Sequence, residues 1–178
     1  MIKLLAISGS LRRFSSNTAL LRAASTLAPA NVKISMYEDL GSLLLFNPDL
    51  EGFEPPSVID FRSKLRMADG VLIASPEYAH GITGALKNAL DWVVGSGEFA
   101  QKPVALLNAS FRAVHAQESL REILKTMDAD IVPEASKTIP LPNNKFGEKD
   151  IIGHTALSSA LRLAVEALVC SIKKNNSF

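Results

Sequence analysis

Stretches of almost purely apolar residues alternate along this chain with segments in which apolar residues recur every three or four positions. The apolar stretches at residues 2–7, 71–74 and 104–107 are typical of strands buried on both faces of a parallel sheet. Residues 32–36 alternate between apolar and polar, as expected of a strand nearer an edge, and a weak fifth strand is expected between residues 129 and 139. The pattern therefore predicts five strands.

The segments between these strands have the period of amphipathic helices. Their apolar positions are Leu20, Ala23, Ala24 and Leu27; Val58, Phe61, Leu65 and Ala68; Leu86, Ala89, Leu90 and Val93; Leu120, Ile123, Leu124 and Met127; and Leu157, Leu161, Ala164, Leu168 and Ile172. Residues 41–56 have neither period and contain several prolines, so we expect an irregular loop there. Strands that alternate with helices indicate an α/β fold, a flavodoxin-like three-layer α/β/α sandwich with a five-stranded parallel sheet in the order 2-1-3-4-5.

The order of the strands also predicts where a ligand binds. In an open parallel sheet, ligands bind outside the carboxyl ends of the strands, at the switch point between the first and third strands. This rule selects the two loops that follow those strands, residues 8–17 and 75–84.

The first of these loops is suited to an anion. It joins a buried strand to the start of a helix, so backbone N–H groups and the positive end of the helix converge there. Ser10, Ser15 and Asn17 offer short polar side chains to phosphate oxygens, and the Arg12 guanidinium adds a charged contact. The loop lacks the motifs of dinucleotide sites and P-loops, so a single terminal phosphate fits best. The alternative is that these residues only cap the helix and Arg12 is solvated.

The second loop is suited to a flat ring. Pro76 restricts the backbone of Ser75 and fixes how the chain leaves the sheet, which gives a rigid rim. Gly81 and Gly84 permit a close approach of the backbone, and Tyr78 offers an aromatic surface with a polar tip. A planar heterocycle is therefore expected to lie against this rim.

Three motifs together resemble the NADPH-dependent FMN reductase family, which includes chromate- and quinone-reducing members. They are Gly9-Ser10-Leu11-Arg12-x-x-Ser15-x-Asn17, Pro76-Glu77-Tyr78 and Leu86-Lys87-Asn88-Ala89-Leu90-Asp91-Trp92. Each motif alone is only moderately specific, but their joint order and spacing make the resemblance strong from Met1 to about the fourth strand.

The resemblance implies the roles of the site residues. The FMN phosphate would be bound by Ser10, Arg12, Ser15 and Asn17. The isoalloxazine ring would be wrapped by Pro76, Glu77 and Tyr78, chiefly through backbone groups. NADPH or NADH would pass a hydride through bound FMN to a small oxidised acceptor, which is a flavin, a quinone, an azo compound or a metal oxyanion. Because FMN carries this chemistry, we expect no catalytic side chain. A homodimer or homotetramer is also implied.

Two departures from the family leave the acceptor open. Many relatives have Asn where this chain has Ala79, and many have a glycine-rich third loop where this chain has residues 108–113. The third loop leaves a neighbouring strand, so Ser110 is expected to contact the cofactor. Phe111 or Arg112 would narrow the entrance of the site or change its charge.

Composition favours a small-molecule partner. With 19 basic and 18 acidic residues in 178, the formal charge is +1, which gives no field for nucleic acid or an anionic membrane. The length suits one FMN-binding domain over residues 1–178. No apolar run approaches the ~20 residues of a membrane span, and the amino end lacks a signal-peptide pattern. The single cysteine, Cys170, is expected to be buried; together these features predict a reducing, cytoplasmic compartment.

Other interpretations of the sequence remain open. The chain is alternatively a flavodoxin-like electron carrier, although such carriers tend to be acidic, or a non-catalytic FMN- or nucleotide-sensing module that signals through oligomer contacts. His80 lies in the predicted flavin loop and has no assigned role. No spacing of cysteines, histidines and carboxylates matches a metal site, so none is predicted. Residues 173–178 are expected to form a frayed end.

Overall fold

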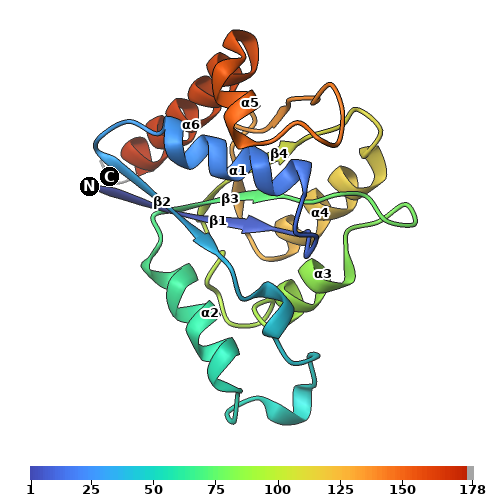
Figure 1. The fold of residues 1–178 in the computed structure, drawn as a ribbon. Coiled ribbons are helices and arrows are strands. Elements are labelled where there is room, and N and C mark those ends of the chain that lie inside the picture. The colour runs from blue at the N-terminus through green and yellow to red at the C-terminus, as the bar shows by residue number, and fades with distance from the viewer. Residues whose placement is uncertain (176–178) are drawn as a thin grey trace.

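A parallel sheet forms the central layer of the protein, whose computed structural model describes residues 1–175 (Figure 1). Its strands are β1 (Ile2–Ser8), β2 (Val32–Tyr37), β3 (Gly70–Ala74), β4 (Pro103–Asn108), β5 (Asp130–Ile131) and β6 (Lys137–Thr138). The order across the sheet is β2-β1-β3-β4-β5, β6 also pairs with β4, and every pair is parallel. The predicted flavodoxin-like strand order is confirmed.

Helices cover both faces of this sheet (Figure 1). They are α1 (Ser16–Leu27), α2 (Pro56–Met67), α3 (Gly84–Asp91), α4 (Val114–Thr126), α5 (Glu148–Gly153) and α6 (Thr155–Asn175), with 3-10 turns η1 (Leu40–Ser42) and η2 (Pro48–Leu50). The helices α1, α5 and α6 pack on one face, and α2, α3 and α4 pack on the other. The three-layer sandwich is also confirmed.

The two cores explain why the strands are apolar throughout. In β1, Leu4 and Ala6 pack with α1 and α6, whereas Leu5 and Ile7 pack with α2 and α3. Because successive side chains of a strand point to opposite faces, a strand covered on both faces needs an apolar residue at each position.

The fifth strand position differs from the expected single weak strand. It consists of the two-residue segments β5 and β6, which pair with the beginning and the end of β4. The helix α5 was not predicted from the sequence. The predicted loop at residues 41–56 is irregular apart from short 3-10 turns.

The last helix corrects two further expectations. It continues to Asn175, so the predicted frayed end is helical as far as that residue; residues 176–178 lie outside the described part. Cys170 is exposed on this helix, not buried. Length and hydropathy alone would allow α6 to cross a membrane, but its apolar stripe forms part of the core against the sheet. We therefore describe it as a helix of the core.

Candidate functional site

A cavity of about 630 Å³ lies at the carboxyl ends of β1, β3 and β4. Its size is within the range of small-molecule sites, roughly 300–1,000 Å³. All eight residues predicted from the sequence line it: Ser10, Arg12, Ser15, Asn17, Pro76, Glu77, Tyr78 and Ser110. The structure thus brings residues from three separate loops to one space, as the switch-point rule anticipates.

The first loop offers hydrogen-bond donors to this cavity. Ser15 is the N-cap of α1, and its Oγ accepts from the backbone N–H of Thr18 at 3.4 Å. The Oγ of Ser10 accepts from the N–H of Arg12 at 3.3 Å. Each hydroxyl therefore uses its oxygen within the protein and keeps its hydrogen for another acceptor. The first turn of α1 contains no acidic residue, so the positive end of the helix is not neutralised there. Capping and anion binding are compatible in this loop.

Asn17 connects the first loop to the third. Its side chain is buried, and its Oδ1 accepts from the backbone N–H of Ala109 at 3.3 Å. Within the third loop, the N–H of Ser110 donates to Asn108 Oδ1 at 3.0 Å, and the N–H of Arg112 donates to Ser110 Oγ at 3.1 Å. These bonds hold the third loop in place, although the loop contains no glycine.

Gly9 lets the first and second loops approach closely. Its N–H donates to the carbonyl of Ala74 at 2.8 Å, and its carbonyl accepts from Thr83 Oγ1 at 2.6 Å. A Cβ at this position would lie 2.7 Å from the Cβ of Ser75, which is closer than real side-chain contacts allow. A larger residue would therefore push the two loops apart.

The second loop ends in a tight hairpin at the rim of the cavity. Tyr78 and Gly81 exchange backbone hydrogen bonds of 3.0 and 3.1 Å. The two residues between them have positive φ angles, 49° at Ala79 and 58° at His80. This is the geometry of a type I′ turn, which normally favours Asn and Gly. Asn would suit this conformation better than Ala, so Ala79 is strained.

The side chain of Glu77 points toward α4. Its Oε2 accepts from the backbone N–H of Ala116 at 2.9 Å, in the first turn of that helix. Its Oε1 lies 3.4 Å from Nδ1 of His80. The ring of His80 packs edge-on against the ring of His115, with 4.6 Å between the ring centres. The His80 side chain is 79% exposed and does not line the cavity. These contacts favour a structural role for His80 and leave mainly the backbone of residue 77 for a ligand.

Sequence reasoning missed one wall of the cavity. The loop between β6 and α5 contributes Leu141, Pro142, Asn143 and Asn144, and Phe14 contributes from the first loop. A signal was present, because these residues follow the fifth strand position at the same edge of the sheet. Within residues 1–175, no three His, Cys, Asp or Glu side chains group in a way that could hold a metal ion.

Comparisons with known proteins show the family of this chain. The sequence pattern of the NADPH-dependent FMN reductase family matches residues 2–141. An NAD(P)H-dependent FMN reductase of Pseudomonas aeruginosa is 40% identical over 152 residues, 82% of this chain and 81% of that protein. An NADPH:quinone oxidoreductase of Arabidopsis thaliana is 39% identical over 155 residues, 82% of this chain and 79% of the relative.

A solved structure supports the fold. The flavoenzyme NAD(P)H:(acceptor) oxidoreductase FerB of Paracoccus denitrificans superimposes with a TM-score of 0.77, covers 98% of both chains and is 24% identical in sequence.

The contact at Gly9 can be tested by a paired substitution. Gly9→Ala should lower the free energy of unfolding by about 1–3 kcal/mol, because the new methyl group overlaps Ser75. Adding Ser75→Gly should restore most of this loss. Gly84→Ala is the matched control, since a Cβ there meets nothing within 4 Å. Urea unfolding of the wild type, these three variants and the Ser75→Gly single variant measures each loss, and purely additive losses in the double variant would contradict the proposed overlap.

The strain at Ala79 leads to a second prediction. Ala79→Asn should stabilise the protein by about 0.5–1 kcal/mol, since Asn tolerates the left-handed conformation better than Ala. Ala79→Val should destabilise it by about 1 kcal/mol or more, because a β-branched residue fits that conformation poorly. Thermal unfolding measures both variants. Equal melting temperatures for the Ala79→Asn and Ala79→Val proteins would show that the turn is not strained.

Proposed function

This chain belongs to the NADPH-dependent FMN reductase family and is an FMN-dependent NAD(P)H oxidoreductase, and we propose that the cavity at the carboxyl ends of β1, β3 and β4 holds the FMN. The observation that carries this proposal is the convergence of all eight predicted residues on one cavity.

The donor set fits the phosphate end of FMN. Arg12, the hydroxyls of Ser10 and Ser15, and Asn17 line the same part of the cavity as the N-terminus of α1. A phosphate dianion is stabilised by N–H and O–H donors and by a guanidinium. Among the described residues that line the cavity, Glu77 alone is acidic, and its carboxylate is bonded to α4. We propose that these four residues of the first loop bind the phosphate.

The second and third loops fit the ring end. The backbone of residues 76–78 forms the rim, and its position is held by the hairpin and by the Glu77 contact to α4. Tyr78 is 51% exposed at this rim, where its ring offers an apolar face to a planar group. We propose that Pro76, Glu77 and Tyr78 hold the isoalloxazine and that Ser110 approaches it from the opposite loop.

The protein side chains position the reactants and do not react. Bound FMN supplies hydride and electron transfer between the nicotinamide donor and the acceptor. Tyr78 and the backbone of the second loop orient the ring, and the first loop fixes the phosphate end. The wall of residues 141–144 and the third loop limit the access of water.

We propose a quinone as the acceptor. A smaller cavity of about 340 Å³ adjoins the rim and is lined by Leu11, Tyr78, Ala85 and neighbouring residues of the first loop and α3. Exposed Phe111 lies in the third loop, beyond the buried residues of β4. A flat, largely apolar quinone suits such surroundings better than a hydrated metal oxyanion. Relatives named quinone oxidoreductases in plants and quinone reductases in bacteria support this choice.

Three further features belong to the same proposal. We propose that residues 1–178 form one domain that binds one FMN, and that two or four copies assemble, as the family resemblance implies. The cytoplasm is the proposed compartment, where the exposed thiol of Cys170 would stay reduced.

Arg12 provides a test of the phosphate site. Arg12→Ala should weaken FMN binding 10- to 100-fold, which corresponds to the ~1.5–3 kcal/mol of a hydrogen bond to a charged group. The melting temperature of the apoprotein should change little, because Arg12 is exposed. Lys33→Ala, which removes an exposed cation of β2, is the control. Quenching of FMN fluorescence gives the dissociation constants, and an unchanged value for Arg12→Ala would refute the phosphate role.

The activity can be tested on protein reconstituted with FMN. Anaerobic NADPH or NADH should bleach the flavin absorbance in a stopped-flow instrument, and a quinone should restore it faster than chromate or an azo dye. Bleaching by a reduced protein donor but by neither nicotinamide would instead indicate an electron carrier. Tight FMN binding without any turnover would indicate a sensing module.

A further inference from the structure

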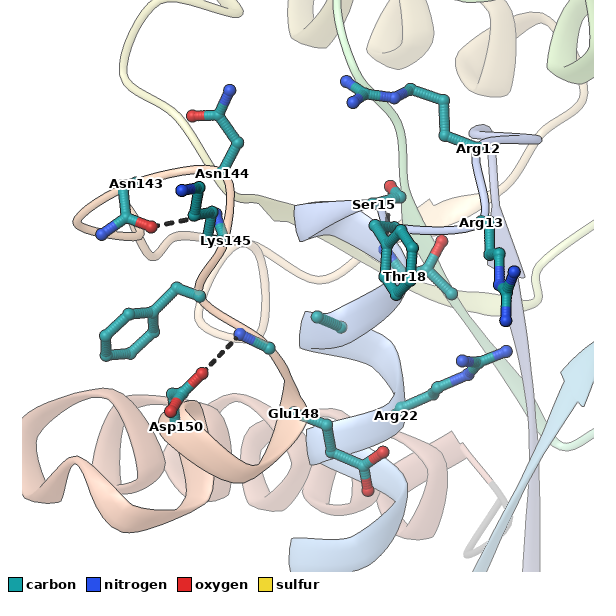
Figure 2. A pocket seen from close by; sticks show the side chains of 14 residues that line it. Arg12, Arg13, Ser15, Thr18, Arg22, Asn143, Asn144, Lys145, Glu148 and Asp150 are labelled. Atoms are coloured by element: carbon teal, nitrogen blue, oxygen red, sulfur yellow. Dashed lines mark hydrogen bonds between the residues drawn. The ribbon is translucent and has the colours of Figure 1, made fainter.

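A second and larger cavity adjoins the proposed FMN site. It has a volume of about 1060 Å³ and lies between α1 and the loop that precedes α5 (Figure 2). We call it the side groove. It shares with the FMN cavity the residues Arg12, Phe14, Ser15, Asn143 and Asn144. Because Arg12 and Ser15 are proposed to hold the FMN phosphate, the side groove begins at the phosphate end of the cofactor.

Positive charge is concentrated in the side groove. Arg12, Arg13 and Arg22 come from the first loop and α1, and Lys145 comes from the opposite wall (Figure 2). The whole chain carries a formal charge of only +1, so these four cations are not part of a generally basic surface. Arg22 has an ion pair with Glu38 at 3.8 Å, but both side chains are largely exposed and the pair is weak.

The two acidic residues of the side groove are engaged by the protein. Glu148 Oε1 accepts from Thr26 Oγ1 at 2.8 Å, which ties α5 to α1. Asp150 Oδ2 accepts from the N–H of Gly147 at 2.8 Å and caps its own helix. These carboxylates are held by structural partners and are outnumbered by the four cations that line the groove, so the groove keeps an excess of positive charge.

Aromatic surface is also present. Phe14 is 75% exposed, and the guanidinium of Arg13 lies 5.4 Å from the centre of its ring. A purine base stacks favourably on such a ring and on a guanidinium plane. The groove therefore combines a stacking platform with sites for more than one phosphate group.

The co-substrate of the enzyme has this chemistry. NADPH is longer than FMN, and while its nicotinamide meets the flavin ring its adenosine half must lie elsewhere. It differs from NADH only by a phosphate on the adenosine 2′ oxygen. We propose that the side groove binds the 2′-phosphoadenosine half of NADPH, with Arg13, Arg22 and Lys145 around the 2′-phosphate, so that the enzyme prefers NADPH to NADH. This inference rests on the proposed FMN site, because it places the groove relative to the FMN phosphate.

Binding to the FMN-loaded protein tests the groove without turnover. Calorimetric titration should show that adenosine 2′,5′-bisphosphate binds at least tenfold more tightly than AMP. Arg22→Ala and Lys145→Ala should each weaken the bisphosphate about five- to tenfold and change AMP less than twofold, since each removes a cation from the 2′-phosphate. Lys149→Ala is the matched control: this exposed lysine of α5 lies four residues from Lys145 and does not line the groove.

Steady-state kinetics provide a second readout. In Arg22→Ala and Lys145→Ala, the KM for NADPH should rise about five- to tenfold with kcat nearly unchanged, while the KM for NADH changes less than twofold. This pattern would support recognition of the 2′-phosphate, because a general loss of folding or of FMN would affect both donors equally.

Three results would overturn the inference. The first is that AMP and the bisphosphate bind with equal affinity. The second is that Lys149→Ala weakens the bisphosphate as much as Arg22→Ala and Lys145→Ala do. The third is that the apoprotein binds FAD more than tenfold more tightly than FMN and that Lys145→Ala removes this difference. The last result would assign the groove to the adenylate of a flavin dinucleotide. The FMN dissociation constants separate the two proposals. If the wild-type apoprotein does not bind FMN, the proposed FMN site is refuted. If it binds FMN normally but does not distinguish the bisphosphate from AMP, only the proposed role of the side groove is refuted.

Discussion

The carboxyl ends of β1 and β3 lie side by side in the sheet, and the chains that leave them touch at Gly9. A hydrogen bond of 2.8 Å from Gly9 to Ala74 extends the strand pairing into the loops, and the missing side chain leaves room for Ser75. The hydroxyls of the first loop and the backbone of the second loop face the same space because of this contact.

Side chains join the three loops to one another and to the helices. Thr83 donates to Gly9, Asn17 accepts from Ala109, and Glu77 accepts from Ala116. The oxygens of Asn17 and Glu77 are thereby used within the protein, as are those of the first-loop hydroxyls. What remains directed at the cavity is dominated by donors, which suits an anionic cofactor and disfavours a cation. The same hydrogen bonds preform the site, so binding orders little additional chain.

The apolar strands and the switch point were predictable, because doubly covered strands must be apolar throughout and their order dictates where the loops meet. The split of the fifth strand into β5 and β6 was not predictable. Between these two segments, the Oγ of Ser136 accepts from the N–H of Leu106, where the carbonyl of a neighbouring strand would normally accept. The far wall of the cavity was also missed, although residues 141–144 follow the fifth strand position at the same edge of the sheet. The exposure of Cys170 reflects an apolar stripe on α6 narrower than its composition indicates.

The hairpin at the rim links the site to local stability. Two successive non-glycine residues in the left-handed region raise the free energy of the ordered turn, so this segment should open more easily than the strands beside it. A ligand that contacts the ordered form suppresses such openings by mass action. The amide hydrogens of Tyr78 and Gly81, which close the turn, should therefore exchange with solvent faster than those of β3 in the free protein, and binding should slow them more than any amide of the core. The rim would then act as an internal reporter of occupancy.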